Sequence, residues 1–541
     1  GMGMAVGMAM AEAHLESVFN KENYPVVDHY TYVLGGDGCM MEGISSEAFS
    51  LAGTLGLSKL IVLYDSNRIS IEGSTDIAFR ENVQERMQAF GFQTITVEDG
   101  NDIDAIGKAI EAAKADTEHP SFITIKTEIG FGCPAKQGKA SAHGEPLGVE
   151  NVEALRKNLN WPSEEPFFVP EEVYKNYSEI AEQKAEVEAA WNVMFAAYCE
   201  EYPEMEALWN QYHNAKAGEA LKDDAGFWAK QEKPEASRAI SGRLINYIKD
   251  VLPNLFGGSA DLAPSNKTNM KDAGDFSKED RAGRNLHFGV RELAMAAIGN
   301  GIMLHGGLRA YVSTFFVFSD YCKPMARLSA LMGVPLTYVF THDSIGVGED
   351  GPTHEPIEQM AALRAMPNFH VFRPCDATET EAAWYSAVTS EHTPTALVLT
   401  RQNLEPMAGS SREALKGGYI IDDCEGTPEL ILIASGSEVA LAVHAKETLA
   451  AEGQKVRVVS MPCMDLFEEQ SEEYKESVLP REVRRRVAVE ALGSFGWDKY
   501  TGLDGKIIAM ERFGASAPAG LLFKKFGFTV EHVVEVAKSL K

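Results

Sequence analysis

Short apolar segments alternate with stretches of helical periodicity along most of the chain. HYTYVLGGDG, LSKLIVLYDSN and PSFITIKTEIG have the length and apolar content of buried strands, and SSEAFSLAGTLG, between the first two, has helical spacing. Buried strands that alternate with helices are typical of parallel sheets covered by helices. The first part of the sequence therefore predicts an α/β domain.

The same pattern recurs in two further blocks. Predicted strands lie at residues 254–260, 309–316, 336–344, 369–374 and 395–402, and a smaller block begins near Pro428 with PELILIASGS. Residues 169–232 are charged and lack a strand pattern, so we predict helices there. Because single cores rarely exceed about 250–300 residues, a chain of 541 residues has room for about three domains. We predict three α/β domains with mainly parallel sheets, at residues 1–210, 235–412 and 413–541, with a linker at 211–234.

The charge balance excludes some classes of partner. The chain has 50 Lys and Arg against 79 Asp and Glu, a net charge of −29. Such a surface repels nucleic acid and anionic membranes, so we expect neither as a partner. The seven cysteines form no CxxC pair, and no apolar run reaches the roughly 18 residues of a membrane span. We therefore expect a cytoplasmic protein with reduced thiols.

Candidate metal ligands follow two neighbouring predicted strands. Gly36-Asp37-Gly38 ends the first, and Asn67 and Ile69 follow the next. Ligands bind at the carboxyl ends of strands in open α/β sheets, where glycine lets the backbone approach a phosphate. The Asp37 carboxylate, the Asn67 amide oxygen and the Ile69 carbonyl would offer three hard oxygen ligands to Mg²⁺ or Ca²⁺, with a diphosphate completing the shell. A GDG alone is often a plain turn, but its spacing from Asn67 resembles the thiamine diphosphate motif.

Longer sequence blocks carry a more specific resemblance. They are GGDGCMMEGIS, GGSADLAPSN, HFGVRELAMAAIGNGI, STFFVFSDY, THDSIGVGEDGPTHEPIEQ, FRPCDATE, ASGSEVALA and VVSMPCMD. With these blocks in order, the chain resembles the transketolase family from its first residues to its last. The resemblance implies a diphosphate-binding domain, a homologous pyrimidine-binding domain and a C-terminal domain, with active sites at a homodimer interface. It also implies transfer of a two-carbon ketol unit from a ketose phosphate, such as xylulose 5-phosphate, to an aldose phosphate, such as ribose 5-phosphate, in the pentose phosphate pathway.

The resemblance also assigns residues to the cofactor. Glu292 corresponds to the glutamate that hydrogen-bonds the aminopyrimidine ring of thiamine diphosphate, a catalytic role that suits a carboxyl group in a partly dry pocket. Aromatic rings suit a flat heterocycle, and three of them correspond to the family's pyrimidine pocket. The cofactor-binding set comprises Asp37, Gly38, Glu42, Asn67, Ile69, His143, Asp261, Glu292, Phe315, Phe318 and Tyr321.

A second set of residues corresponds to the family's substrate contacts. Guanidinium groups bind phosphate oxygens through charge-assisted hydrogen bonds, and histidine can exchange protons with sugar hydroxyls near neutral pH. The histidines His143, His342 and His354 are the implied catalytic partners of Glu292. The implied substrate-binding set comprises Arg238, Ser265, His342, Asp350, His354 and Arg401.

The chain also departs from the family. It lacks roughly the first hundred residues, which normally carry two or three active-site histidines and a GxLGxG-type loop that touches the cofactor. Three interpretations therefore stay open: a short transketolase that works alone, one part of a split enzyme that needs a separate N-terminal subunit, and a cofactor-binding dimer without turnover. Another thiamine enzyme, such as pyruvate dehydrogenase or deoxyxylulose-phosphate synthase, would share Asp37, Asn67 and Glu292. It would not predict HDSIGVGEDGPTH or the set of Arg238, Ser265 and Arg401.

Overall fold

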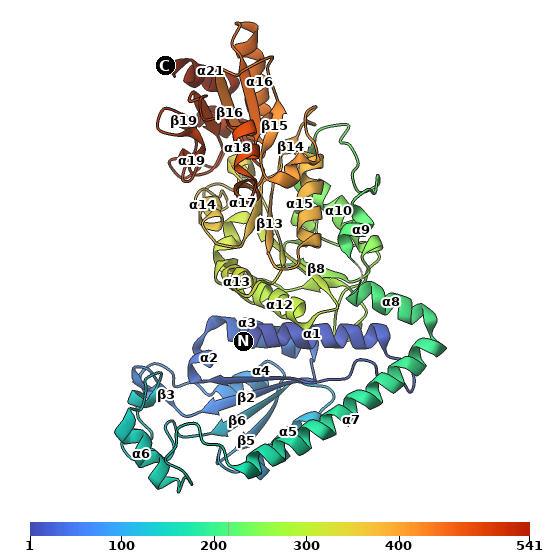
Figure 1. Ribbon diagram of the computed structural model, residues 1–541, viewed down its shortest axis with the longest axis vertical. Helices are drawn as coiled ribbons and strands as arrows, with labels where there is room; N and C mark the ends of the chain where they lie inside the picture. Colours follow the sequence, from blue (N-terminus) through green and yellow to red (C-terminus); the bar gives the residue numbers. More distant parts are fainter. Residues whose placement is uncertain (215, 541) are drawn as a thin grey trace. The chain divides into compact units, whose positions relative to one another are not determined.

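The computed structural model describes residues 1–214 and 216–540, which form two compact units (Figure 1). The first unit comprises Gly1–Gln211 and Phe276–Ala282. The second comprises Tyr212–Asp275 and the chain from Gly283 onward. Within the described residues, no helix combines the length and apolar character that crossing a lipid bilayer requires.

A four-stranded parallel sheet forms the centre of the first unit, in the order β1-β2-β6-β5. The strands predicted in this block are confirmed, and helices connect them. Its strands are β1 (Thr31–Gly36), β2 (Leu60–Ser66), β5 (Gln93–Val97) and β6 (Ser121–Lys126), with a small hairpin of β3 (Ile69–Ser70) and β4 (Gly73–Ser74). Its helices are α1 (Met2–Phe19), α2 (Asp37–Met41), α3 (Gly43–Leu55), α4 (Val83–Ala89), α5 (Ile103–Ala115), α6 (Val149–Asn158) and α7 (Glu171–Glu201).

Small residues let the helices of the first unit pack closely. Most of α1 is buried, because its Gly, Ala and Met side chains offer apolar or small surface on every side of the helix. Within α3, a Cβ at Gly53 would lie 1.7 Å from the carbonyl oxygen of Phe90, so only glycine fits there. The helix then ends at Gly56, whose φ of 58° lies in the left-handed region that glycine adopts without strain.

The second unit contains two sheets. A six-stranded parallel sheet has the order β12-β13-β11-β10-β8-β9, and a five-stranded sheet has the order β15-β17-β16-β18-β19, with β15 antiparallel at its edge. The predicted strands of both blocks are confirmed, so the chain has the expected α/β fold with mainly parallel sheets. The first sheet comprises β8 (Leu255–Ser259), β9 (Asn285–His287), β10 (Arg309–Phe315), β11 (Thr337–Thr341), β12 (His370–Phe372) and β13 (Thr395–Leu399). The second comprises β15 (Tyr419–Asp422), β16 (Leu430–Ala434), β17 (Val456–Ser460), β18 (Arg486–Val489) and β19 (Lys506–Ile508).

Helices cover both sheets of the second unit, and a short antiparallel pair joins β7 (Glu235–Ala236) to β14 (Asn403–Leu404). The stretch predicted to be helical contains α7, α8 (Pro203–His213) and α9 (Ala217–Leu221). The remaining helices are α10 (Ser237–Val251), α11 (Ala263–Asn266), α12 (Glu292–His305), α13 (Ser319–Met332), α14 (Gln359–Arg364), α15 (Ala377–Thr389), α16 (Glu438–Ala451), α17 (Met464–Glu468), α18 (Glu472–Val478), α19 (Asp498–Thr501), α20 (Ala519–Lys525) and α21 (Val530–Ser539).

A buried charge network connects the two sheets of the second unit. The guanidinium of Arg373, which follows β12, is fully buried and pairs with Asp343 at 2.8 Å and with Glu438 at 2.5 Å. Its Nη1 also donates to the carbonyl oxygen of Ser435 at 2.9 Å. A Cβ at Gly436 would lie 2.7 Å from Arg373 Cζ, so glycine makes room for the guanidinium. Burial alone would lower the pKa of Arg373, but the nearby carboxylates outweigh burial and raise it.

A second arginine extends this network. Arg364 binds Glu490 through both of its terminal nitrogens, each at 2.8 Å. Glu490 also accepts from the Trp497 indole at 2.8 Å and from the Ser435 hydroxyl at 2.5 Å. Burial disfavours the ionised form of Glu490, but the arginines outweigh burial and lower its pKa to about 2. Glu490 therefore stays ionised and hydrogen-bonded to Arg364 at neutral pH.

Arg373→Met tests how much this network contributes to the stability of the fold. Removal of one partner leaves buried charges uncompensated, so we expect a loss of roughly 3–5 kcal/mol in the free energy of unfolding. The matched control is Arg481→Met, whose 79% exposed side chain pairs with the surface residues Glu472 and Glu476 and should change stability by less than about 1 kcal/mol. Urea unfolding followed by circular dichroism measures both variants, and equal midpoints for the two would contradict the assigned role of Arg373.

Candidate active site

Candidate residues lie at the carboxyl ends of parallel strands in both units. In the first unit Asp37 follows β1 and Asn67 follows β2. In the second unit His342 follows β11, Arg401 follows β13 and Phe315 ends β10. Parallel strands end at one edge of a sheet, so each unit gathers its own candidates at that edge.

The Asp37 carboxylate is buried at the point where β1 meets α2. Its Oδ1 accepts a hydrogen bond from the Tyr64 hydroxyl at 2.5 Å, and its Oδ2 accepts from the main-chain N–H of Arg68 at 2.9 Å. Burial and the hydrogen bond to Asp37 raise the pKa of Tyr64, so the phenol stays protonated and donates. We call Asp37, Tyr64, Asn67, Arg68 and Ile69 the Asp37 cluster.

The loop after β2 completes this cluster. Asn67 Oδ1 accepts from the main-chain N–H of Ile69 at 2.9 Å, which orients the amide oxygen. Arg68 has a φ of 62°, a left-handed conformation that costs a non-glycine residue about 1–3 kcal/mol and often marks functional loops. This turn brings the Arg68 N–H to Asp37 and places Asn67 in the same loop.

A cavity of about 500 Å³ opens beside Asp37. Two guanidinium groups, Arg68 and Arg80, line it together with the carboxylates of Asp37, Asp76 and Glu81. Arg68 already pairs with Asp76 at 3.0 Å. Because positive side chains do not predominate, an anion as highly charged as a diphosphate would need a cation between it and the carboxylates.

The donor set suits such a cation. Asp37, Asn67 and Ile69 offer a carboxylate, an amide oxygen and a main-chain carbonyl, all of them the hard oxygen donors that Mg²⁺ and Ca²⁺ prefer. Among the described residues, no group of three or more His, Cys, Asp or Glu could hold a metal unaided. The set contains one carboxylate, so further oxygens from a bound diphosphate or water would complete the shell. These residues fit a divalent ion that arrives with a diphosphate.

Three other predicted residues of the first unit lie outside this hydrogen-bonded cluster. Gly38 lies within α2, directly after Asp37, and Glu42 is exposed at the start of α3. His143 ends a short 3-10 turn at residues 140–142, and its exposed ring makes no hydrogen bond to any described residue.

The second unit brings three predicted substrate residues together. Arg238, at the start of α10, donates to the carbonyl oxygen of Ser265 at 2.8 Å, and its Nη1 lies 3.4 Å from His342 Nε2. The charge of Arg401 also acts on both Arg238 and His342. Two guanidinium groups and a histidine are therefore close enough to act on one ligand. We call Arg238, Ser265, Phe315, Phe318, His342 and His354 the His342 cluster.

The tautomer of His342 follows from its neighbours. The Thr341 hydroxyl donates to Asn266 Oδ1 at 2.8 Å, so it can accept from His342 Nδ1, which lies 2.8 Å away. Nδ1 then carries the proton, and Nε2 is the acceptor that faces Arg238. Burial, reinforced by the positive charges of Arg238 and Arg401, lowers the pKa of His342 to about 3. The ring is neutral at physiological pH and holds a lone pair at Nε2.

Aromatic rings form a platform beside this histidine. The ring centroids of Phe315 and His342 lie 3.8 Å apart, and Phe315 stacks on Phe318 with a centroid distance of 6.0 Å. His354 meets Phe318 edge-on at 5.5 Å, and its Nδ1 lies 2.9 Å from the Thr353 hydroxyl. Tyr321 lies 6.0 Å from Phe318 and is 61% exposed, so this ring leaves an open apolar face. Such rings suit contact with a planar heterocycle.

Glu292 lies at the start of α12, as predicted. The helix N-terminus favours a carboxylate there, because the unpaired main-chain N–H groups carry partial positive charge. Residues 294–302 of α12 are buried, which fixes the direction of the helix. The thiol of Cys322 contacts the carbonyl oxygen of Glu292 at 3.6 Å.

Two predicted residues make no such contacts. Asp261 and Asp350 are exposed, and neither side chain forms a hydrogen bond or an ion pair with a described residue. Asp261 has a φ of 60° and lies two residues after β8. His342, directly after β11, has a φ of 65°. Left-handed residues therefore follow two strands of this sheet, as Arg68 follows β2 in the first unit.

The structure adds supporting residues that sequence reasoning missed. Tyr64 holds Asp37, and Thr341 with Asn266 orients His342. Tyr64 and Thr341 lie at or near strand ends, which was the available signal. Asn266 ends α11, 75 residues from Thr341, and nothing in the local pattern links the two.

Known proteins resemble this chain over its whole length. Three family models match in order: the transketolase thiamine diphosphate binding domain at residues 1–217, the transketolase pyrimidine binding domain at 233–407 and the transketolase-like C-terminal domain at 417–529. The transketolases of Halalkalibacterium halodurans and Bacillus subtilis are each 52% identical over the whole chain, which covers 81% and 82% of their lengths. Transketolase from Leishmania mexicana matches in structure with a TM-score of 0.95 at 45% identity, over 100% of this chain and 80% of that one.

These findings define an enzyme with thiamine diphosphate-binding domains. With relatives 52% identical over the whole of this chain, it belongs to the transketolase family of transferases. The fold class and the activity expected from the sequence are thereby confirmed.

The neutral state of His342 can be tested by nuclear magnetic resonance. Because burial and two arginines lower its pKa to about 3, the ring should show no protonation between pH 8 and pH 5. The folded value lies below the ordinary 6.5, so this group lends stability above pH 6.5 and loses it as pH falls towards 3. In Arg238→Met one positive charge is gone, and the pKa of His342 should rise. Protonation of the wild-type ring between pH 6 and 7 would contradict the assignment.

Proposed function

We propose that this chain transfers a two-carbon ketol unit from a ketose phosphate, such as xylulose 5-phosphate, to an aldose phosphate, such as ribose 5-phosphate. The observation that carries the proposal is the His342 cluster, where a neutral histidine acceptor lies between guanidinium groups and an aromatic platform. A phosphorylated polyol needs these complements: cations for its phosphate, and donors and acceptors for its hydroxyls.

The cofactor-binding roles follow from the residues that fit them. Asp37, Asn67 and Ile69 would hold Mg²⁺ or Ca²⁺ on the diphosphate, with Gly38 and His143 beside it. Thiamine diphosphate, when bound, supplies the carbon nucleophile for cleavage and formation of the carbon–carbon bond. Glu292 would hold a proton in a hydrogen bond to the pyrimidine ring. The other cofactor-binding residues of this proposal are Glu42, Asp261, Phe315, Phe318 and Tyr321.

The substrate roles rest on charge and hydrogen-bonding capacity. Arg238 and Arg401 would bind the phosphate, and Ser265 would hold Arg238 in place through its carbonyl oxygen. His342 would accept a hydrogen bond from a sugar hydroxyl at Nε2, because its Nδ1 proton is already directed to Thr341. His354 would exchange protons near the substrate carbonyl.

The setting of the enzyme is part of the proposal. We place it in the cytoplasm, in the pentose phosphate pathway, as a homodimer in which the diphosphate-binding domain of one subunit and the pyrimidine-binding domain of the other hold one cofactor. Exposed Glu42 and Asp350 and the open faces of Tyr321 and His143 support this assembly, because a second subunit could cover them. A split enzyme with a separate N-terminal subunit and a dimer without turnover are the alternatives.

One assay separates these alternatives. The purified chain with thiamine diphosphate, Mg²⁺, xylulose 5-phosphate and ribose 5-phosphate should release glyceraldehyde 3-phosphate. Turnover by the chain alone would exclude the split enzyme and the inactive dimer. Without turnover, activity restored by an added N-terminal fragment would establish the split enzyme.

Glu292→Ala tests the mechanism in the same assay. Loss of a proton-transferring carboxyl group should lower kcat by at least about 100-fold. The matched control is Glu447→Gln on the exposed face of α16, which should retain the wild-type rate. Full activity of Glu292→Ala would contradict the proposed role of this residue.

A further inference from the structure

The chain between β11 and α14 carries Asp350 and His354, two residues of the proposed substrate site, on a glycine-rich turn. Gly348 and Gly351 have φ values of 83° and 76°, in the left-handed region that glycine adopts freely. The main-chain N–H groups of His354 and Glu355 both donate to the carbonyl oxygen of Gly351, at 2.9 Å and 3.1 Å. Because glycine adopts other conformations as easily, contacts from outside the turn are needed to keep His354 in one place.

Such contacts come from residues 514–517, directly before α20, which we call the 514–517 segment. The hydroxyl of Ser516 donates to the carbonyl oxygen of Glu349 at 2.6 Å. A Cβ at Gly351 would lie 3.1 Å from Ser516 Cβ, so the two backbones are in close contact. Helix α20 packs against the 3-10 turn at Ile345–Val347. The C-terminal part of the unit therefore contacts the turn along most of its length.

The carboxyl group of Glu355 is the buried part of this contact. The residue is 2% exposed, and a Cβ at Gly514 would lie 1.7 Å from Glu355 Oε2, so the segment approaches the carboxyl group as closely as glycine allows. Among the described residues, no side chain hydrogen-bonds to either of its oxygens. Burial raises the pKa of Glu355 to about 7, although the main-chain N–H of Ala515 favours the ionised form. Close packing and one main-chain N–H, without a counter-ion, thus hold this side chain.

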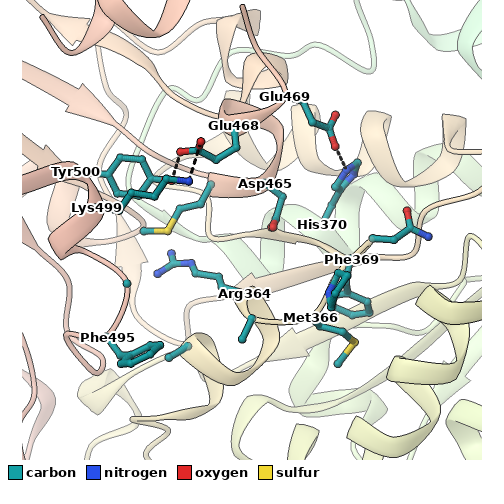
Figure 2. A pocket seen from close by; sticks show the side chains of 16 residues that line it. Arg364, Met366, Phe369, His370, Asp465, Glu468, Glu469, Phe495, Lys499 and Tyr500 are labelled. Atoms are coloured by element: carbon teal, nitrogen blue, oxygen red, sulfur yellow. Dashed lines mark hydrogen bonds and ion pairs between the residues drawn. The ribbon is translucent and has the colours of Figure 1, made fainter. Parts of the chain in front are cut away.

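The chain is also anchored on the other side of Glu355. The main-chain N–H of Gly493 donates to the carbonyl oxygen of Ile357 at 2.9 Å, and Arg364, at the end of α14, binds Glu490. Figure 2 shows Arg364 beside a cavity of about 390 Å³ that residues of α14 and α17 line. Since α14 is fixed in this way, the conformational freedom of this part of the chain is confined to the turn before Glu355.

We propose that Glu355 is a positioning residue for His354, and that the 514–517 segment acts through it. The Glu355 side chain reaches Gly514 and Ala515 and fixes the end of the turn, next to His354. This role rests on the proposed function, in which His354 exchanges protons near the substrate carbonyl. The length of the side chain carries the effect, because no described cation pairs with the carboxyl group. The C-terminal part of the unit, which contains none of the predicted site residues, would thus support catalysis.

Two substitutions separate length from charge. Glu355→Asp keeps the carboxyl group but is one methylene too short, so kcat with both sugar phosphates should fall by about tenfold or more. Glu355→Gln keeps the length without the charge and should stay within about twofold of the wild-type kcat. The apparent KM for thiamine diphosphate should not change in either variant, because neither touches the proposed cofactor groups. The matched control is Glu358→Asp, an exposed carboxylate three residues later, which should behave like wild type.

Hydrogen–deuterium exchange measured by mass spectrometry tests the positioning without turnover. In Glu355→Asp the peptide that covers residues 345–358 should exchange at least about fivefold faster than in wild type, while peptides of β16 and β18 stay unchanged. Glu355→Gln should exchange like wild type. If this pattern is found but the wild-type chain shows no turnover, the proposed function fails and the positioning of the turn by Glu355 stands.

Ser516→Ala decides the question if Glu355→Asp does not fold, because its side chain is exposed. Loss of its hydrogen bond to the Glu349 carbonyl should speed exchange of the same peptide several-fold. Ser477→Ala is the matched control, since it removes a similar hydrogen bond, to the Tyr474 carbonyl at 2.7 Å, on α18. Wild-type kcat or exchange in Glu355→Asp, equal losses of kcat in Glu355→Asp and Glu355→Gln, or wild-type exchange in Ser516→Ala would each overturn the proposal.

Discussion

The buried guanidinium of Arg373 lies between the carboxylates of Asp343 and Glu438. Asp343 directly follows His342, and Glu438 is the first residue of α16. Removal of the guanidinium from water is costly, and the surrounding carboxylates, the Ser435 carbonyl and the hydroxyls of Ser435 and Ser437 offset that cost. The turn that carries His342 is thereby tied to the C-terminal part of the unit. Through Glu490 and Arg364 the same network reaches the wall of the cavity in Figure 2. The turn that carries His342 and the junction of the two sheets thus share one set of charges.

The second constraint is the geometry of parallel strands. Strands that end at one edge of a sheet bring distant residues together, and the first residues beyond them must turn sharply. Arg68 and His342 make that turn with positive φ although neither is glycine. The strain is compensated by specific partners: Asp37 accepts from the Arg68 N–H, and Thr341 holds the His342 ring. Such turns, together with these hydrogen bonds, hold Asp37 and the His342 ring in fixed orientations after the strand ends.

The sequence pattern predicted the strands before Asp37, Asn67 and His342, because apolar runs and the residues that follow them are local features. The start of α12 at Glu292 was predictable for the same reason. The protonation state of His342 was not, since it depends on Arg238 and Arg401, which are distant in sequence. Nor does any periodicity reveal that Arg373 pairs with Glu438, 65 residues away. Strands and helix starts were therefore predictable from the sequence. Charge pairs between residues distant in sequence could be found only from the structure.

The central claim is that the Asp37 cluster and Glu292 serve one thiamine diphosphate in a homodimer, and complementation tests it most directly. Asp37→Ala and Glu292→Ala chains should each be inactive alone. When they are mixed, dissociated and reassociated, random pairing gives half of the dimers one intact site, so activity should recover to about a quarter of the wild-type rate. A mixture that forms dimers but stays inactive would contradict the account.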